Sequence, residues 1–309
     1  MKHTVLACVL LAASLANLSA RVPGQQPEGF PAAGAPAVVT MISAGAAPRS
    51  ALRYTPPAGA RQHFEMTMAM SMAMEVGGAS VPAVPLPVMK IGADCVVTEV
   101  APSGDVTFTT AFTGAEIDTS ANPALASQFE SMKDALTSVK GSATISNRGV
   151  VRSSAFDFTK MANSQLAQVM GSTTDMLKNV STPLPEEEVG VGARWEVRNT
   201  LATNGLTMFQ KTDYELVAYD GKVVTLKTTV VQTALPQAMS NPALPPGAEV
   251  QLERYTGGGS GNMRLNPSEL IPVSDGTIDS TMAMTVSMSG MVQQMVVSTS
   301  VKMTIAPGK

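Results

Sequence analysis

The sequence predicts a mainly β protein of the α+β class. We expect one large curved antiparallel sheet, or half-barrel, with one or two helices covering its concave face. Apolar and polar residues alternate along several long segments, which is the period of a half-buried strand. Asn-Gly and Asp-Gly pairs stand between such segments, where they favour tight hairpins. Two segments in the middle of the chain instead repeat apolar residues at helical spacing.

The chain of 309 residues divides into three parts. Residues 1–20 join Lys2 to the apolar run VLACVLLAASLANL, which is too short to span a membrane but is typical of an export signal. Residues 21–50 are rich in Pro, Ala and Gly and predict a flexible linker. Residues 51–309 predict a single β-rich domain. We therefore expect export to the periplasm or the extracellular space.

Cysteine usage suits an exported protein without covalent cross-links. Cys8 stands in VLAC, which has the form of a lipidation box, but it comes too early for an apolar segment to precede it. We therefore expect no lipid anchor. After removal of residues 1–20, Cys95 is the only cysteine, and one thiol cannot form an internal disulfide. Its apolar surroundings predict a buried, unreactive thiol.

Composition argues against several kinds of partner. The chain is 15% charged and only 4% aromatic, and its formal net charge is -3. No run of Lys or Arg stands out that would bind nucleic acid or hold an anionic membrane surface. We therefore expect no nucleic-acid partner and no integral membrane segment once the signal is removed.

The first predicted strands lie in the amino-terminal half. Residues 61–76 alternate strictly between larger apolar and smaller residues, and a Pro-rich loop follows at 81–87. The segments 89–97 and 106–112 alternate in the same way and predict a hairpin about the turn APSGD. A further tight hairpin is predicted about Asn147–Gly149.

Two helices are predicted between these strands and the next ones. Asn122 and Pro123 suit the start of the first helix, and Gly141 lies just past its end. Its single apolar stripe consists of Leu125, Phe129, Met132, Leu136 and Val139. The second helix is predicted within 158–180, where Gly171 interrupts the apolar pattern.

The carboxy-terminal half predicts strands again. Three strands within 195–231 are joined at Asn204-Gly205 and Asp220-Gly221, both strong hairpin signals. The segment QLERYTGGGSGNMRL (251–265) predicts a short Gly-rich hairpin with GGGSG at its tip or in a flexible loop. A last hairpin is predicted over 275–305.

Three stretches resemble a family of bacterial exported proteins of unknown function. They are LRYTPPAGARQHFEMTMAMSM, PLPEEEVGVGARWEV with Gly192 and Trp195, and the Asp-Gly pair at 275–276, which the resemblance implies to be a turn before a closing hairpin. Where that family carries an acidic residue after the glycine, this chain has Ala193. The resemblance spans roughly 50–305. By architecture the chain is also similar to LolA-like periplasmic carriers, which implies a half-barrel whose helices plug an apolar groove.

Methionines form the most unusual pattern. Met66, Met68, Met70, Met72 and Met74 stand at alternate positions, and Met282, Met284 and Met288 follow near the end of the chain. Alternate residues of a strand point the same way, about 6.7 Å apart, because each residue rises roughly 3.3 Å. Three interpretations stay open: a strand face that packs in a core, an apolar lining for a ligand, or thioether ligands for Cu(I).

The ligand interpretation gives the functional hypothesis. We expect an exported, non-enzymatic protein that binds a hydrophobic ligand or lipid in a cleft between sheet and helices, with no cofactor. The expected lining is the eight methionines named above, faced by Leu125, Phe129, Met132 and Leu136 from the first helix. The alternative is a structural or interaction protein of the cell envelope with a filled core, and Cu(I) binding by methionines is a remote alternative.

Catalytic and metal motifs are weak in this sequence. His63 is the only histidine after residue 20, and no G-x-S-x-G or H-E-x-x-H motif accompanies it. Glu186, Glu187 and Glu188 form a run in a Pro-flanked loop, which favours a solvated surface over a metal site. Trp195, the only tryptophan, is predicted to anchor the core. We therefore expect neither an enzyme nor a metal protein.

Overall fold

The computed structural model describes residues 26–120, 133, 137, 139–157, 181–203, 205–239, 249–288 and 291–308. The strands in chain order are β1 (Val38–Ser43), β2 (Arg61–Val76), β3 (Ala79–Pro85), β4 (Val88–Val100), β5 (Val106–Asp118), β6 (Lys140–Ile145), β7 (Val151–Asp157), β8 (Arg194–Thr203), β9 (Leu206–Tyr219), β10 (Val224–Ala234), β11 (Gln237–Met239), β12 (Glu249–Leu265), β13 (Val273–Met288) and β14 (Met291–Pro307).

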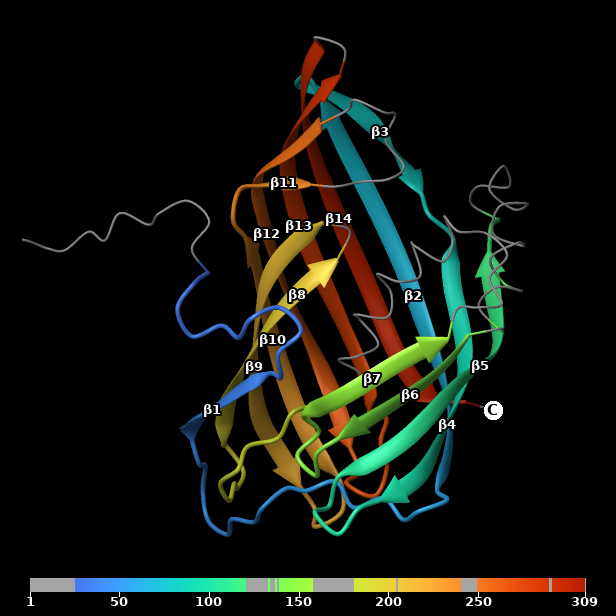
Figure 1. The fold of residues 1–309 in the computed structure, drawn as a ribbon, viewed down its shortest axis with the longest axis vertical. Coiled ribbons are helices and arrows are strands. Elements are labelled where there is room, and N and C mark those ends of the chain that lie inside the picture. Colours follow the sequence, from blue (N-terminus) through green and yellow to red (C-terminus); the bar gives the residue numbers. More distant parts are fainter. Residues whose placement is uncertain are drawn as a thin grey trace, which may run out of the picture.

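All of these strands belong to one antiparallel sheet (Figure 1). Its strand order is β1-β8-β9-β10-β12-β13-β14-β2-β4-β5-β6-β7, with β3 paired to β2 and β11 paired to β12. β1 and β7 end this order and do not pair with each other, so the sheet does not close. The predictions of a mainly β protein and of one large antiparallel sheet are confirmed.

The two predicted helices fall largely outside the described residues. Of the segments 122–140 and 158–180, the described residues are Lys133 and Thr137, which have helical backbone, and the stretch from Val139. The described part of the chain therefore does not support a helical layer over the concave face. Leu125, Phe129, Met132 and Leu136 also lie outside the described residues. No helix in the described ranges is long and apolar enough to cross a membrane.

Part of the predicted linker belongs to the sheet, which corrects the assignment of 21–50. Val38–Ser43 form β1, which pairs with β8 from Val38 opposite Arg198 to Ser43 opposite Arg194. Phe30 packs edge to face against Phe209 with ring centroids 5.3 Å apart. Composition misled the prediction because VVTMIS is a short β-branched run inside a stretch dominated by Pro, Ala and Gly.

The glycine-rich segment GGGSG is also not a hairpin tip. Gly257 to Gly261 lie in the middle of β12, which runs unbroken over 17 residues. A Cβ added at Gly259 would lie 2.1 Å from the carbonyl oxygen of Thr277, and one at Gly261 would lie 2.4 Å from that of Asp275. The backbone of β13 therefore approaches β12 so closely that only glycine fits, as at the tight bends of curved sheets.

The neighbouring prediction of a turn at 275–276 is wrong for a related reason. Asp275 and Gly276 lie inside β13, opposite Asn262 and Gly261 of β12. An Asp-Gly pair favours a turn only where the chain needs one. Here Gly276 serves the close approach of the two strands, since its own added Cβ would meet the carbonyl oxygen of Ser260 at 3.2 Å.

The other predicted turns are confirmed. Gly205 and Gly221 join β8 to β9 and β9 to β10 with φ of 74° and 87°, and Gly149 joins β6 to β7 with φ of 74°. Positive φ costs glycine little. The carboxylate of Asp220 accepts hydrogen bonds from the backbone N–H groups of Lys222 and Val223, which lower the pKa of that carboxyl.

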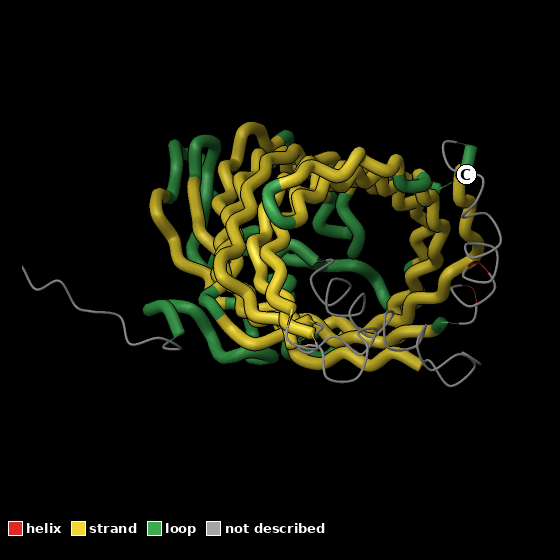
Figure 2. Tube along the Cα trace, turned by 90° about the horizontal axis from the view of Figure 1, so that it is seen from above, coloured by secondary structure: helices red, strands yellow, loops and turns green. Residues whose placement is uncertain are grey.

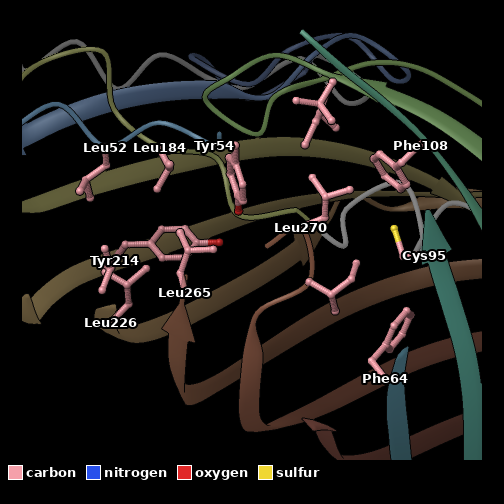
Figure 3. Close-up of a cluster of buried hydrophobic side chains, with 14 of the residues drawn as sticks. Leu52, Tyr54, Phe64, Cys95, Phe108, Leu184, Tyr214, Leu226, Leu265 and Leu270 are labelled. Atoms are coloured by element: carbon pink, nitrogen blue, oxygen red, sulfur yellow. The ribbon is translucent and has the colours of Figure 1, made fainter. Parts of the chain in front are cut away.

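Trp195 anchors the core, as predicted. Its side chain is fully buried and stacks on Tyr214 with ring centroids 5.4 Å apart, and its indole N–H donates to the carbonyl oxygen of Pro183 at 3.0 Å. Three loop segments contribute Leu52, Tyr54, Leu184 and Leu270 to the same core cluster (Figure 3). Gln62 fastens the third loop, because its side chain bonds the backbone of Leu270 and Ile271. The core is therefore sheet packed against loops.

The two faces of the sheet differ completely in charge. Cross-strand partners share a face, so the register assigns every described strand residue to the inner face, which carries the core, or to the outer face. Figure 2 shows the strands curving around the core loops. Within the described strands no Asp, Glu, Lys or Arg side chain has a register position on the inner face. The pairs Lys90–Glu65 and Lys211–Asp213 are examples from the outer face.

A glycine-to-alanine pair tests the bend. We expect Gly259→Ala to lower the free energy of unfolding by roughly 2–4 kcal/mol, because a clash with the Thr277 carbonyl forces backbone to move. Gly258→Ala is the matched control, since its Cβ comes no nearer than 3.7 Å to the Val230 carbonyl. Its effect should stay within about 0.5 kcal/mol. Urea unfolding followed by Trp195 fluorescence measures both, and equal losses would contradict the account.

Candidate functional site

The predicted methionines all lie on the inner face, on two strands separated by β14. β14 pairs with β2 on one side and with β13 on the other. Val297 of β14 stands opposite both Met74 and Met282, so those two methionines flank one residue. The structure therefore brings the two predicted groups onto one continuous surface, and the β13–β14 hairpin is confirmed.

These methionines do not share one environment. Met66 packs against the main core, and Met282 packs against a second, smaller cluster formed by Leu206, Met208 and Leu252. Met288 is 37% exposed at the end of β13. Met68, Met70, Met72, Met74 and Met284 are half-buried and belong to neither cluster. The packing interpretation thus describes Met66 and Met282, whereas the other methionines line a partly open surface.

Residues of β14 complete this surface, although the sequence analysis left them out of the site. Met303 stands opposite Met68, and Met295 stands opposite Met284. Met303 is 40% exposed. The alternation over 295–305 was a usable signal for one apolar face. Only the pairing of β14 between β2 and β13 shows that this face is the same one.

A row of polar residues crosses the inner face, and sequence reasoning missed it. Successive register pairs connect seven neighbouring strands, from β8 to β2. We call this the polar row, and it consists of Asn199, Gln210, Gln232, Gly257, Ser280 and Thr299, ending beside Met72. No local signal could have found it, because each strand contributes a single residue.

Apolar rows lie on both sides of the polar row. On one side, Tyr255, Met282, Val297 and Met74 stand in register across β12, β13, β14 and β2. On the other side, Val230, Gly259, Ile278, Val301 and Met70 stand in register from β10 to β2. The inner face that the described strands form is therefore amphipathic, and its register positions carry no charge.

A cavity of about 540 Å³ lies where the sheet fails to close. One wall is β8 from Asn199 to Ala202, beyond the last residue that pairs with β1. The facing wall is β7 from Val151 to Ser154, whose other edge pairs with β6. Residues 33–37 of the amino-terminal segment, together with Gly149, Ser181 and Pro183, line the rest. Asn199, the first member of the polar row, thus reaches this seam cavity.

A second depression lies on the opposite side of the methionine strands. It measures about 560 Å³ and is lined mainly by small outer-face residues, including Ser71, Ala73, Thr281, Ser298 and Ser300. Along their strands these residues alternate with inner-face residues such as Met72, Met282 and Thr299. The groove offers hydroxyl groups on a flat strand surface, and it carries the one acidic residue Asp279 among its lining.

The residues considered for catalysis stand apart from the methionine surface. His63 Nδ1 lies 2.6 Å from a carboxylate oxygen of Asp94, its cross-strand partner on the outer face. Within the described residues no hydroxyl or thiol hydrogen-bonds the His63 ring. In the same part of the chain, no group of three His, Cys, Asp or Glu side chains is arranged to hold a metal ion. Glu186 pairs with Arg148 at 3.2 Å and is strongly exposed.

Cys95 is buried, as predicted. Its side chain is 2% exposed on the inner face of β4, and it is not in a disulfide. Burial raises the pKa of the Cys95 thiol to about 12, and a hydrogen bond with Thr110 lowers it only in part. The thiol therefore stays protonated and shielded near neutral pH.

The sequence was also compared with protein-family models and with curated proteins. No protein-family model matches the sequence, and no curated protein sequence matches it.

Thiol labelling tests the burial of Cys95. In a Cys8→Ser chain at pH 8, we expect a disulfide reagent such as DTNB to react with native Cys95 at least about 100-fold more slowly than in urea, because labelling requires opening of the core. A control reaction with free cysteine at the same pH sets the unhindered rate. Rapid labelling of the native protein would show that β4 opens easily.

Proposed function

We propose that this protein is exported and binds a hydrophobic small molecule such as a lipid, without catalysis, on the inner face of its sheet. The observation that carries the proposal is the partly exposed apolar wall of β13, β14 and β2. Met303 is 40% exposed there, and Met68, Met70, Met72 and Met74 are half-buried. Covering such a surface removes apolar area from water, which is favourable by about 25 cal/mol per Å².

The choice of side chain also supports a ligand. Methionine is unbranched and flexible, so a wall of methionines adapts to apolar partners of variable shape. A core selected for one tight packing arrangement uses Val, Ile and Leu instead. Val, Ile and Leu together make up most of the buried residues of the main core cluster, which contains Trp195. Its Leu216, Leu226 and Leu265 are fully buried.

The two helices predicted from the sequence complete this proposal. We infer that 122–140 and 158–180 cover the open part of the inner face, so that Leu125, Phe129, Met132 and Leu136 close the site over the methionine wall. The resemblance to LolA-like carriers supports the same arrangement. The export signal in residues 1–20 would place the protein in the periplasm or outside the cell, where a carrier for an insoluble molecule has a clear use.

Native mass spectrometry is the direct test of the proposal. The exported protein, purified without detergent and incubated with a lipid extract, should carry an adduct of several hundred daltons that organic solvent removes. A bare protein mass after this incubation would instead favour the rival function, a structural or interaction protein of the cell envelope. An adduct of copper mass after incubation with Cu(I) would favour thioether coordination.

Paired variants test the location of binding. We expect Met70→Gln with Met303→Gln to weaken binding of the neutral fluorescent probe N-phenyl-1-naphthylamine by about tenfold, because two apolar contacts are lost. The matched control is Ser71→Gln with Ser298→Gln, which adds the same side chains to the outer face of the same strands. Loss of binding in the control alone would move the site to the outer groove and overturn the proposal. Unfolding curves should be unchanged for both proteins.

A further inference from the structure

Hydrogen bonds join two members of the polar row, Gln210 and Gln232, to each other and to Tyr255 of the adjacent apolar row. Tyr255 Oη donates to Gln232 Oε1 at 2.9 Å, and Gln232 Nε2 donates to Gln210 Oε1 at 2.8 Å. Gln210 Nε2 then has only a long contact of 3.5 Å, with Thr212 Oγ1. The chain of bonds therefore leaves an incompletely used amide donor at Gln210, whose register partner on β8 is Asn199.

The ends of the polar row carry unused hydrogen-bonding groups. In the described part of the chain, the side chains of Asn199 and Thr299 have no hydrogen-bond partner, and both are half-buried. Asn199 lines the seam cavity. Polar side chains on a surface that a ligand covers need partners from that ligand, because an unpaired buried amide costs free energy.

Among the described strand residues, none places a charge beside the polar row on its own face. Every Asp, Glu, Lys and Arg of the described strands lies on the outer face or at a bulge. Arg152 is one of the bulge residues. It is exposed, lies at the bulge in β7 and lines the seam cavity that Asn199 also lines. A carboxylate or phosphate held against the row would therefore find no countercharge among the described strand residues of that face, and desolvating such a charge is costly.

We propose that the ligand joins an apolar chain to an uncharged hydrogen-bonding group, such as a hydroxyl, ester or amide, and that the polar row binds this group between the two apolar rows. This inference rests on the proposed function and specifies its ligand class. Amide side chains can both donate and accept, so they suit neutral groups that do the same.

A matched series of twelve-carbon competitors tests the ligand class. Monolauroylglycerol, laurate at pH 8 and 1-chlorododecane are titrated against bound N-phenyl-1-naphthylamine. We expect monolauroylglycerol to displace the probe at about tenfold lower concentration than either of the others, because one or two additional hydrogen bonds form.

Two variants connect this preference to the polar row. Asn199→Leu removes a side chain that has no partner in the described chain, and Gln232→Leu removes the centre of the hydrogen-bonded chain. Each should reduce the preference for monolauroylglycerol to less than about threefold, while the probe still binds. Thr233→Leu, an exposed outer-face change on the same strand as Gln232, should leave the preference intact. Asn199→Leu keeps the test valid if Gln232→Leu proves unstable.

The outcomes separate this inference from the proposed function. If neither the probe nor any competitor binds the parent protein, the proposed function fails, and the inference fails with it. If the probe binds but laurate competes as well as monolauroylglycerol, only the inference fails. Preference for laurate that disappears in Arg152→Gln would show that the seam cavity recognises an anion. A preference unchanged in Asn199→Leu and Gln232→Leu would also overturn the role of the polar row.

Discussion

The close approach of β12 and β13 is the constraint on which the rest of the structure depends. A sheet of this width can enclose an inner face only if it bends, and the bend brings the carbonyl oxygens of Thr277 and Asp275 over the inner face of β12. Glycine at 259 and 261 leaves room for them. The methionine strands β13, β14 and β2 follow this bend in the sheet order, so their place on the inner wall depends on it.

Packing of the core explains why the inner face carries no charge around Trp195. It does not explain why the rest of that face carries none. Around Trp195, loops cover the sheet, and a charged residue there would be desolvated at a cost of several kcal/mol. Along Met68, Met70 and Met303 the same face is partly exposed, where water could solvate a charge. The absence of charge nevertheless continues across this open region. The proposed ligand-binding surface would explain that continuity, whereas a filled core requires an uncharged face only where the core lies.

In the proposed function, the polar row would give the methionine surface a second kind of recognition. Two hydrogen bonds join Gln210, Gln232 and Tyr255 and so connect β9, β10 and β12. Burial raises the pKa of Tyr255, so its hydroxyl remains a donor near neutral pH. Such a network tolerates a low dielectric because its members are paired. Asn199 and Thr299, which have no hydrogen-bond partner within the described residues, are the places where the proposed neutral ligand would gain most.

Much of the fold was predictable because its signals are local. The alternation in 61–76 and 89–97 reports burial on one face of a strand, and Asp220-Gly221 reports a turn through its own dihedral angles. The same local reasoning failed at Gly257–Gly261 and at Asp275-Gly276. Glycine permits both a turn and a close approach of strands, and the choice depends on a neighbour distant in sequence. The helices at 122–140 and 158–180 remain predictions.

By itself the sequence determined most of the strand-forming segments, four of the turns, the burial of Cys95 and Trp195, and the candidate methionines. These follow from residue period and residue type within a few positions of each other. Only the tertiary structure decided that β1 joins the sheet, that β14 lies between the two methionine strands, and that one polar residue from each of several strands forms a row. Backbone pairing between distant segments makes these choices, because any extended strand offers the same N–H and C=O groups to many possible partners.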